Sequence, residues 1–217
     1  MFLIVAFIKK WSWRLFAEPL AIRLLDFYFF RLLQGRVVGA DHLSKEPCIL
    51  AFNHSSYLDW LLVYHLFNRH YGIPVFFLAK SKLNANPLWR GCIRHGQAIV
   101  VDYEQKHSIR KALGEMRAHL LAGHVVGIFP EGTRSADGRL QSPQEGVAWL
   151  ALQAGVPIIP IALQGFYEAW PRHQRLPGIA RCTIRIGRPI VESTAMDRSQ
   201  FTQKLMNTLT QLLAETN

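Results

Sequence analysis

The sequence predicts an α/β fold: a single domain with a mixed, mostly parallel sheet flanked by helices, preceded by an N-terminal amphipathic helical segment. From residue 36 onward, short apolar runs alternate with stretches of helical periodicity, which is typical of strands joined by helices. The chain has 217 residues, 50% of them hydrophobic, which suits one buried core and excludes a disordered protein. We therefore expect an N-terminal segment over residues 1–35 and one domain over residues 36–217.

The first predicted element is an amphipathic helix over Leu20–Gln34. Its polar residues Arg23, Asp26, Arg31 and Gln34 fall within an arc of roughly 140° in a helical projection, and the rest of its surface is apolar. Upstream, tryptophan and phenylalanine alternate with lysine and arginine, a mixture typical of the bilayer interface. We expect this segment to be a membrane anchor; packing of the helix on the protein's own core is the alternative.

The N-terminus itself predicts neither a signal peptide nor a membrane span. Met1–Ile8 is apolar but much shorter than the roughly 20 residues of a spanning helix, and its charges follow the apolar run instead of preceding it. The predicted protein is therefore monotopic. Its three separated cysteines form no disulfide framework and favour a reducing compartment, so we expect it at the cytoplasmic face of the inner membrane.

Seven apolar runs are predicted as strands and four longer segments as helices. The strands are Arg36–Ala40, Cys48–Phe52, Val75–Ala79, Ala98–Val101, Val125–Phe129, Pro157–Leu163 and Thr183–Ile186. The helices are Ser56–Asn68, His107–Ala122, Pro143–Ala154 and Asp197–Glu215. The third helix has the clearest boundaries, with Ser142 as N-cap, Pro143 in the first turn, Glu145 at the third position and Gly155 as the stop.

A formal net charge of +10 indicates an anionic partner, either nucleic acid, an anionic membrane or a phosphorylated substrate. No nucleic-acid recognition motif is present, so we expect no nucleic-acid partner. The Gly-x-Ser-x-Gly motif of serine hydrolases is also absent. His65 and His70 are five residues apart, without the i, i+4 spacing of a helical metal site, so we interpret them as surface or interface residues.

Polar residues follow several predicted strands at the point where each strand ends. Ligands of open α/β sheets bind at the carboxyl ends of strands, so these side chains are expected to share one rim. The first group is His54 and Asp59, which meet if His54 lies in a turn and Asp59 in the first helical turn. A carboxylate on one ring nitrogen leaves the other nitrogen as a base. Alternatively, Asp59 only caps a helix.

A second group, Glu131 to Arg134, follows the strand Val125–Phe129. Gly132 permits close backbone approach, and the planar guanidinium of Arg134 is suited to a phosphate. Lys80, at the end of another strand, adds a point charge. Alternatively, Glu131 and Arg134 pair with each other.

Two of these segments resemble the glycerolipid acyltransferase family. Asn-His-x-x-x-x-Asp at residues 53–59 is similar to the first conserved block of that family, and Phe-Pro-Glu-Gly-Thr-Arg-Ser at residues 129–135 is similar to the third. Ala79-Lys80 and residues 156–161 resemble two further blocks. The second block departs from the family pattern, because Asp102-Tyr103 stands where Asp-Arg is common, and Glu145-Gly146 replaces a frequent Lys-Gly pair.

The resemblance implies acyl transfer from acyl-CoA or acyl-carrier protein to the hydroxyl of a lysophospholipid, chiefly lysophosphatidic acid, at a membrane surface. It implies His54 as the general base, Asp59 as its orienting partner, and no metal or other cofactor. The implied substrate-binding residues are Lys80, Glu131, Gly132, Thr133 and Arg134. Other acceptors stay open (another lysophospholipid, glycerol 3-phosphate or a lyso-aminolipid), as does a non-catalytic lipid-binding protein.

Overall fold

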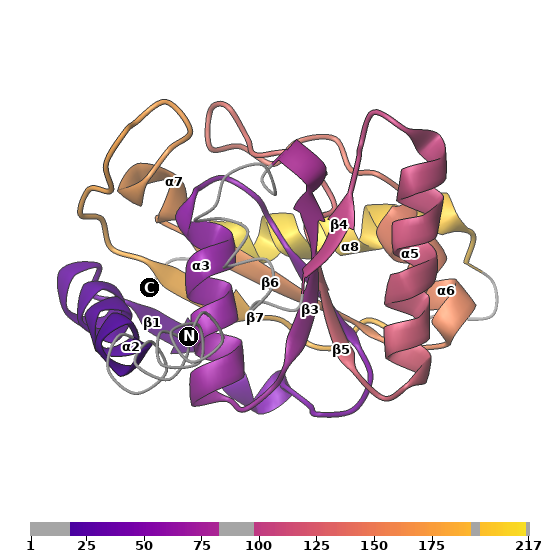
Figure 1. Ribbon diagram of the computed structural model, residues 1–217, viewed down its shortest axis with the longest axis horizontal. Helices are drawn as coiled ribbons and strands as arrows, with labels where there is room; N and C mark the ends of the chain where they lie inside the picture. Colours follow the sequence, from indigo (N-terminus) through magenta and orange to yellow (C-terminus); the bar gives the residue numbers. More distant parts are fainter. Residues whose placement is uncertain (1–17, 83–97, 192–195, 216–217) are drawn as a thin grey trace, which may run out of the picture.

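A computed structural model describes residues 18–82, 98–191 and 196–215, which form a seven-stranded sheet with helices on both faces (Figure 1). The strand order is β1-β7-β6-β2-β5-β3-β4. All neighbouring strands are parallel except β6 and β7, which are antiparallel. The strands are β1 (Arg36–Val38), β2 (Ile49–Phe52), β3 (Val75–Lys80), β4 (Ala98–Val101), β5 (Val125–Ile128), β6 (Ile158–Gln164) and β7 (Thr183–Ile186). The predicted mixed, mostly parallel sheet is confirmed.

The sheet is buried on both faces, as expected for parallel strands with helical crossovers. Alternate residues of β2 illustrate this, because Leu50 and Phe52 belong to one core cluster, whereas Ile49 and Ala51 belong to the other. The first face is covered by α3 (Leu58–His65), α7 (Phe166–Ala169) and the helical turn η2 (Phe27–Leu32); the second is covered by α5 (Lys106–Leu121), α6 (Gly146–Ala154) and α8 (Arg198–Ala214).

Two predicted helix starts differ from the structure by two or three residues, and the other two by one residue. The helix predicted from Pro143 begins instead at Gly146, because the preceding residues bind the loop after β5: Gln144 N donates to Pro130 O over 2.8 Å. Its predicted stop at Gly155 is confirmed by a left-handed φ of 65°. The helix predicted from Ser56 begins at Leu58 and changes after His65 into a π-helical turn, η4 (Leu66–His70).

The N-terminal helix has one apolar side packed on the core and another apolar side exposed. It consists of α2 (Glu18–Asp26), which continues into the π-helical turn η2 and lies beside α3 in Figure 1. Phe29 and Leu33 are buried in the core, while Leu24 and Phe27 are 59% and 56% exposed. Packing on the core and an apolar outer face therefore coexist. The predicted interfacial residues between 9 and 16 lie outside the described residues.

Among the helices that the structure describes, none has both the length and the apolar character needed to cross a bilayer.

Candidate active site

A cavity of about 580 Å³ lies where β2, β5 and β3 end. These three strands are parallel neighbours, so the segments that follow them meet at one edge of the sheet, as predicted. Five of the seven predicted site residues line the cavity: His54, Lys80, Gly132, Thr133 and Arg134. Asp59 and Glu131 do not line it, and both are hydrogen-bonded to the cavity-lining His54.

His54 and Asp59 form a hydrogen-bonded pair. His54 lies in the turn after β2, and its Nδ1 is 2.7 Å from Oδ2 of Asp59 in the first turn of α3. The same carboxylate oxygen accepts the backbone N–H groups of Ser55 and Ser56 at 2.7 and 2.8 Å. Because a carboxylate only accepts hydrogen bonds, Nδ1 carries the proton and Nε2 presents a lone pair.

The His54 ring is fixed on a second side by Phe129, at the end of β5. The two rings stack with their centroids 4.1 Å apart. Phe129 also lines the cavity. Sequence reasoning included this residue only as part of the motif, although an aromatic residue directly before Pro-Glu-Gly was the available signal.

Glu131 is buried and binds backbone rather than facing the cavity. Oε1 accepts the backbone N–H of His54 over 2.6 Å, and Oε2 accepts that of Gln141 over 2.8 Å. Burial raises the pKa of Glu131 to about 7, with the Asp59 carboxylate adding to the rise and the two N–H donors opposing it. Glu131 therefore ties the His54 turn to the segment before α6.

Arg134 lies at the cavity with an unpaired nitrogen. Its guanidinium carbon is 3.7 Å from the ring centroid of Tyr57, and its Nη1 is buried without a hydrogen-bond partner in the described part of the chain. The alternative pairing with Glu131 is not seen among the described residues; both carboxylate oxygens of Glu131 bind backbone amides instead. An unpaired buried guanidinium nitrogen is suited to an anionic ligand.

Lys80 and Arg172 add positive charge to the cavity, and three of its lining residues were not among the predicted site residues: Tyr57, Tyr103 and Arg172. The Lys80 ammonium is 5.6 Å from the ring centroid of Tyr103, just as the guanidinium of Arg134 lies over the ring of Tyr57. Arg172 comes from a loop after α7, far along the chain from the predicted blocks.

One further group of potential metal ligands, Asp26, His65 and His70, gathers elsewhere. None of the three lines the cavity. Any cation bound there would not contact the His54–Asp59 pair directly.

Comparison with known proteins bears on this site. The family model described as Acyltransferase matches residues 34–164, which include both blocks. The 1-acyl-sn-glycerol-3-phosphate acyltransferase alpha of Ovis aries is 30% identical over 178 residues, covering 79% of this chain and 59% of that protein. The Mus musculus protein of the same name is 32% identical over 181 residues, covering 79% of this chain and 60% of that one. The chain thus spans about three fifths of the length of these relatives.

A solved structure supports the fold. The crystal structure of the 1-acyl-sn-glycerophosphate (LPA) acyltransferase PlsC from Thermotoga maritima matches with a TM-score of 0.70 and 21% identity, covering 90% of this chain and 81% of that one. The seven-stranded α/β architecture is therefore shared with that protein. Since the family model also spans more than half of the sequence, the chain belongs to the acyltransferase family.

Proposed function

We propose that this protein transfers a fatty acyl group from a thioester donor to the free hydroxyl of lysophosphatidic acid, giving phosphatidic acid. One observation carries the proposal: His54, which is hydrogen-bonded to Asp59, and Arg134 line the same cavity. A base and an anion-binding group on one cavity suit an acceptor with both a hydroxyl and a phosphate. The names of the relatives point to the same acceptor.

In the proposed reaction, Nε2 of His54 removes the hydroxyl proton while the acceptor oxygen attacks the thioester carbonyl carbon. The C–O bond forms and the C–S bond breaks. The departing thiolate takes the proton back from the imidazolium, which leaves an ester and a free thiol. The negative charge of Asp59 stabilises the imidazolium between these steps and holds its Nδ1–H. No protein nucleophile is needed, because the cavity brings both substrates together.

The phosphate of the acceptor is proposed to bind Arg134 and Lys80. Arg134 offers a fixed guanidinium on Tyr57, and Lys80 adds a second positive charge at the end of β3. Gly132 has a left-handed φ of 67°, and Thr133 follows it at the cavity wall, so this turn shapes the phosphate pocket. Glu131 holds the pocket from behind through His54 and Gln141.

The proposed donors are acyl-CoA and acyl-carrier protein, and we propose that the reaction uses no other cofactor. The proposed location is the cytoplasmic face of the inner membrane, with the outer face of α2 and η2 in one leaflet. The exposed apolar residues of that face support docking; they are Leu20, Leu24, Phe27 and Phe30.

The test is an acyl-transfer assay with lysophosphatidic acid and acyl-CoA on the native protein, on His54→Ala and on a matched control, His107→Ala, which removes an exposed histidine of α5. We expect His54→Ala to lose roughly 10²–10⁴-fold in kcat and the control to lose nothing. Equal activity of the His54 variant and the native protein would show that His54 is not the general base.

A panel of acceptors identifies the substrate. Lysophosphatidic acid is compared with another lysophospholipid, glycerol 3-phosphate and a monoacylglycerol without phosphate. Arg134→Gln is expected to raise KM for phosphorylated acceptors and to leave that of the monoacylglycerol unchanged. A native protein that binds these lipids but transfers no acyl group to any of them would instead be a lipid-binding protein.

A further inference from the structure

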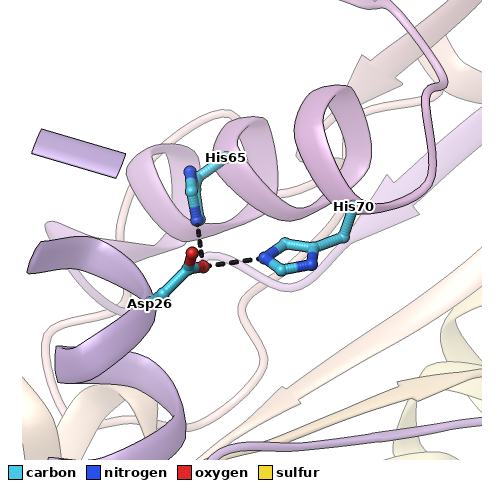
Figure 2. Close-up of side chains that lie close together, drawn as sticks. All are labelled: Asp26, His65 and His70. Carbon is cyan, nitrogen blue, oxygen red and sulfur yellow. Dashed lines mark hydrogen bonds and ion pairs between the residues drawn. The ribbon is translucent and has the colours of Figure 1, made fainter. Parts of the chain in front are cut away.

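Three side chains meet at the junction of the N-terminal helix and α3, away from the proposed active site. Oδ1 of Asp26 lies 2.7 Å from Nε2 of His65 and 2.7 Å from Nε2 of His70 (Figure 2). Figure 2 shows both imidazole rings directed at the one carboxylate; Asp26 comes from the end of α2, and the two histidines come from α3 and η4. The potential ligand atoms of the three residues all lie within 4.8 Å of one another.

The π-helical turn η4 explains why two histidines five residues apart share a face. In an α-helix, positions i and i+5 point about 140° apart, which is why the sequence predicted no metal site here. In η4, which begins directly after His65 and ends at His70, each turn holds more residues, so i and i+5 come one above the other. Asp26 likewise lies at the junction of α2 and the π-helical turn η2.

Paired π-helical turns are informative because such turns are rare and are frequently found at functional sites. Here one turn brings His70 beside His65, and the other begins at the residue after Asp26. The unusual backbone on both sides of the junction thus converges on these three side chains.

We propose that Asp26, His65 and His70 form a binding site for a divalent transition-metal ion of the zinc class, which fastens α2 and η2 to α3 and η4. Two imidazoles and one carboxylate are a common zinc ligand set, whereas Mg²⁺ and Ca²⁺ prefer oxygen ligands only. One carboxylate and two imidazoles also suit a dication better than an anion.

Taking the ion requires all three ligand separations to change. Ligand atoms at about 2.0 Å from a tetrahedral zinc ion are about 3.3 Å from one another. The two N···O separations of 2.7 Å would open by about 0.6 Å each, and the two imidazole nitrogens, which lie within 4.8 Å of each other, would take the same spacing. Rotation of the partly exposed Asp26 and His70 side chains can supply these changes while the buried His65 stays in place.

Burial of the three ligands is graded. His65 is 3% exposed, Asp26 32% and His70 39%, so the ion can enter from the His70 side and keep a water molecule as fourth ligand.

The experiment measures Zn²⁺ and Co²⁺ binding to the full metal-free chain by calorimetry, with Mg²⁺ as the negative control. Visible absorption of the Co²⁺ form reports coordination by nitrogen ligands. The variants are Asp26→Asn and His70→Gln, which change partly exposed side chains and spare the buried His65. His107→Gln is the matched control, and His124→Gln tests the other pair of adjacent histidines, His119 and His124, whose Nδ1 atoms are 3.4 Å apart.

We expect one Zn²⁺ per chain, a raised unfolding temperature on Zn²⁺ addition, and binding more than about tenfold weaker in Asp26→Asn and His70→Gln but not in the two controls. The proposal is overturned if native protein binds no Zn²⁺, if binding survives in both ligand variants, or if it disappears in His124→Gln. Since the readout is metal binding and unfolding temperature, the result is independent of acyl transfer.

Discussion

Asp59 does more than hold the imidazole of His54. Its Oδ2 accepts three hydrogen bonds, from His54 and from the backbone of Ser55 and Ser56, while its Oδ1 is buried with no partner among the described residues. The carboxylate therefore holds the turn that carries His54 and also pairs with the imidazole. The alternative that Asp59 only caps a helix does not hold, because its bonds go to His54, Ser55 and Ser56, all of which precede the cap residue Tyr57 of α3.

Replacing Asp59 by Asn separates these two tasks. An Asn oxygen in the place of Oδ2 can still accept the two backbone N–H groups and Nδ1–H, but it carries no negative charge, so the imidazolium loses its charge stabilisation. We expect Asp59→Asn to fold and to lose up to roughly 10⁴-fold in kcat, with little change in KM. Steady-state kinetics and circular dichroism test this, and native-like turnover in the variant would contradict the assigned role.

Glu131 makes the stability of the protein depend on pH. Its pKa is about 7 in the folded chain against an ordinary value of 4.5, so folding takes up a proton between these values. The contribution of Glu131 to the free energy of unfolding is therefore fully present below about 4.5 and is lost as the pH rises through about 7. Glu131→Gln has no charge to titrate at this position.

Urea unfolding of native protein and Glu131→Gln at a series of pH values measures that contribution. The free energy of unfolding of the native protein is expected to fall relative to that of the variant as the pH rises through about 7. Parallel pH profiles would mean that the N–H groups of His54 and Gln141 keep the carboxylate ionised in spite of its burial.

At the scale of elements, local sequence signals predicted the existence of helices and strands better than their ends. Ser142, Pro143 and Glu145 form a good helix start by sequence, yet Gln141 and Gln144 donate backbone hydrogen bonds to Glu131 and Pro130, which keep this segment out of the helix. The π-helical turn after His65 could not be predicted from the sequence either, because its periodicity differs from that of an α-helix over one turn only.

The contact between β5 and β3 depends on Gly127. A Cβ atom there would lie 2.2 Å from Cε1 of Phe77, a fully buried ring packed near Phe52 and Phe129. We expect Gly127→Ala to lower the free energy of unfolding by about 1–3 kcal/mol through overpacking. Gly114→Ala is the matched control in α5, with no atom within 4 Å of the new methyl group, and is expected to raise it by about 0.5–1 kcal/mol. Equal effects of the two changes in denaturant unfolding would contradict this account.

At the scale of the whole molecule, the sequence predicted the sheet and the gathering of polar residues at the edge where its strands end. Both follow from the alternation of strands and helices along the chain. His54, Lys80 and Arg134 follow strands that are parallel neighbours, so one topological rule placed them together. No local signal predicts that β7 and β1 run opposite to the other strands, because this depends on the path of long loops. The same holds for the position of Arg172 at the cavity. The meeting of His65 and His70 at Asp26 was not predicted because it depends on the π-helical turn η4, which an α-helical projection does not anticipate.

The outer apolar face of the molecule extends beyond the N-terminal helix. Tyr28 of η2 donates a hydrogen bond from its hydroxyl to Gly178 O over 2.8 Å, which places the loop after α7 beside the helix. That loop exposes Leu176 and Ile179 and also contains the cavity-lining Arg172. An apolar surface beside an arginine of the cavity is suited to contact with a bilayer, as the proposed function requires.

Charge placed on this face tests membrane docking without removing any segment. We expect Leu24→Glu and Phe27→Glu to bind anionic phospholipid vesicles at least about tenfold more weakly than the native chain, because each change withdraws a large apolar side chain from the bilayer. Leu121→Glu is the control, since Leu121 is 61% exposed at the end of α5, on the other face of the sheet. Acyl transfer to detergent-dispersed acceptor is expected to be equal in all four proteins, as none of these residues lines the cavity. Vesicle sedimentation that is unchanged in both helix variants, or reduced equally in Leu121→Glu, would show that docking does not use this face.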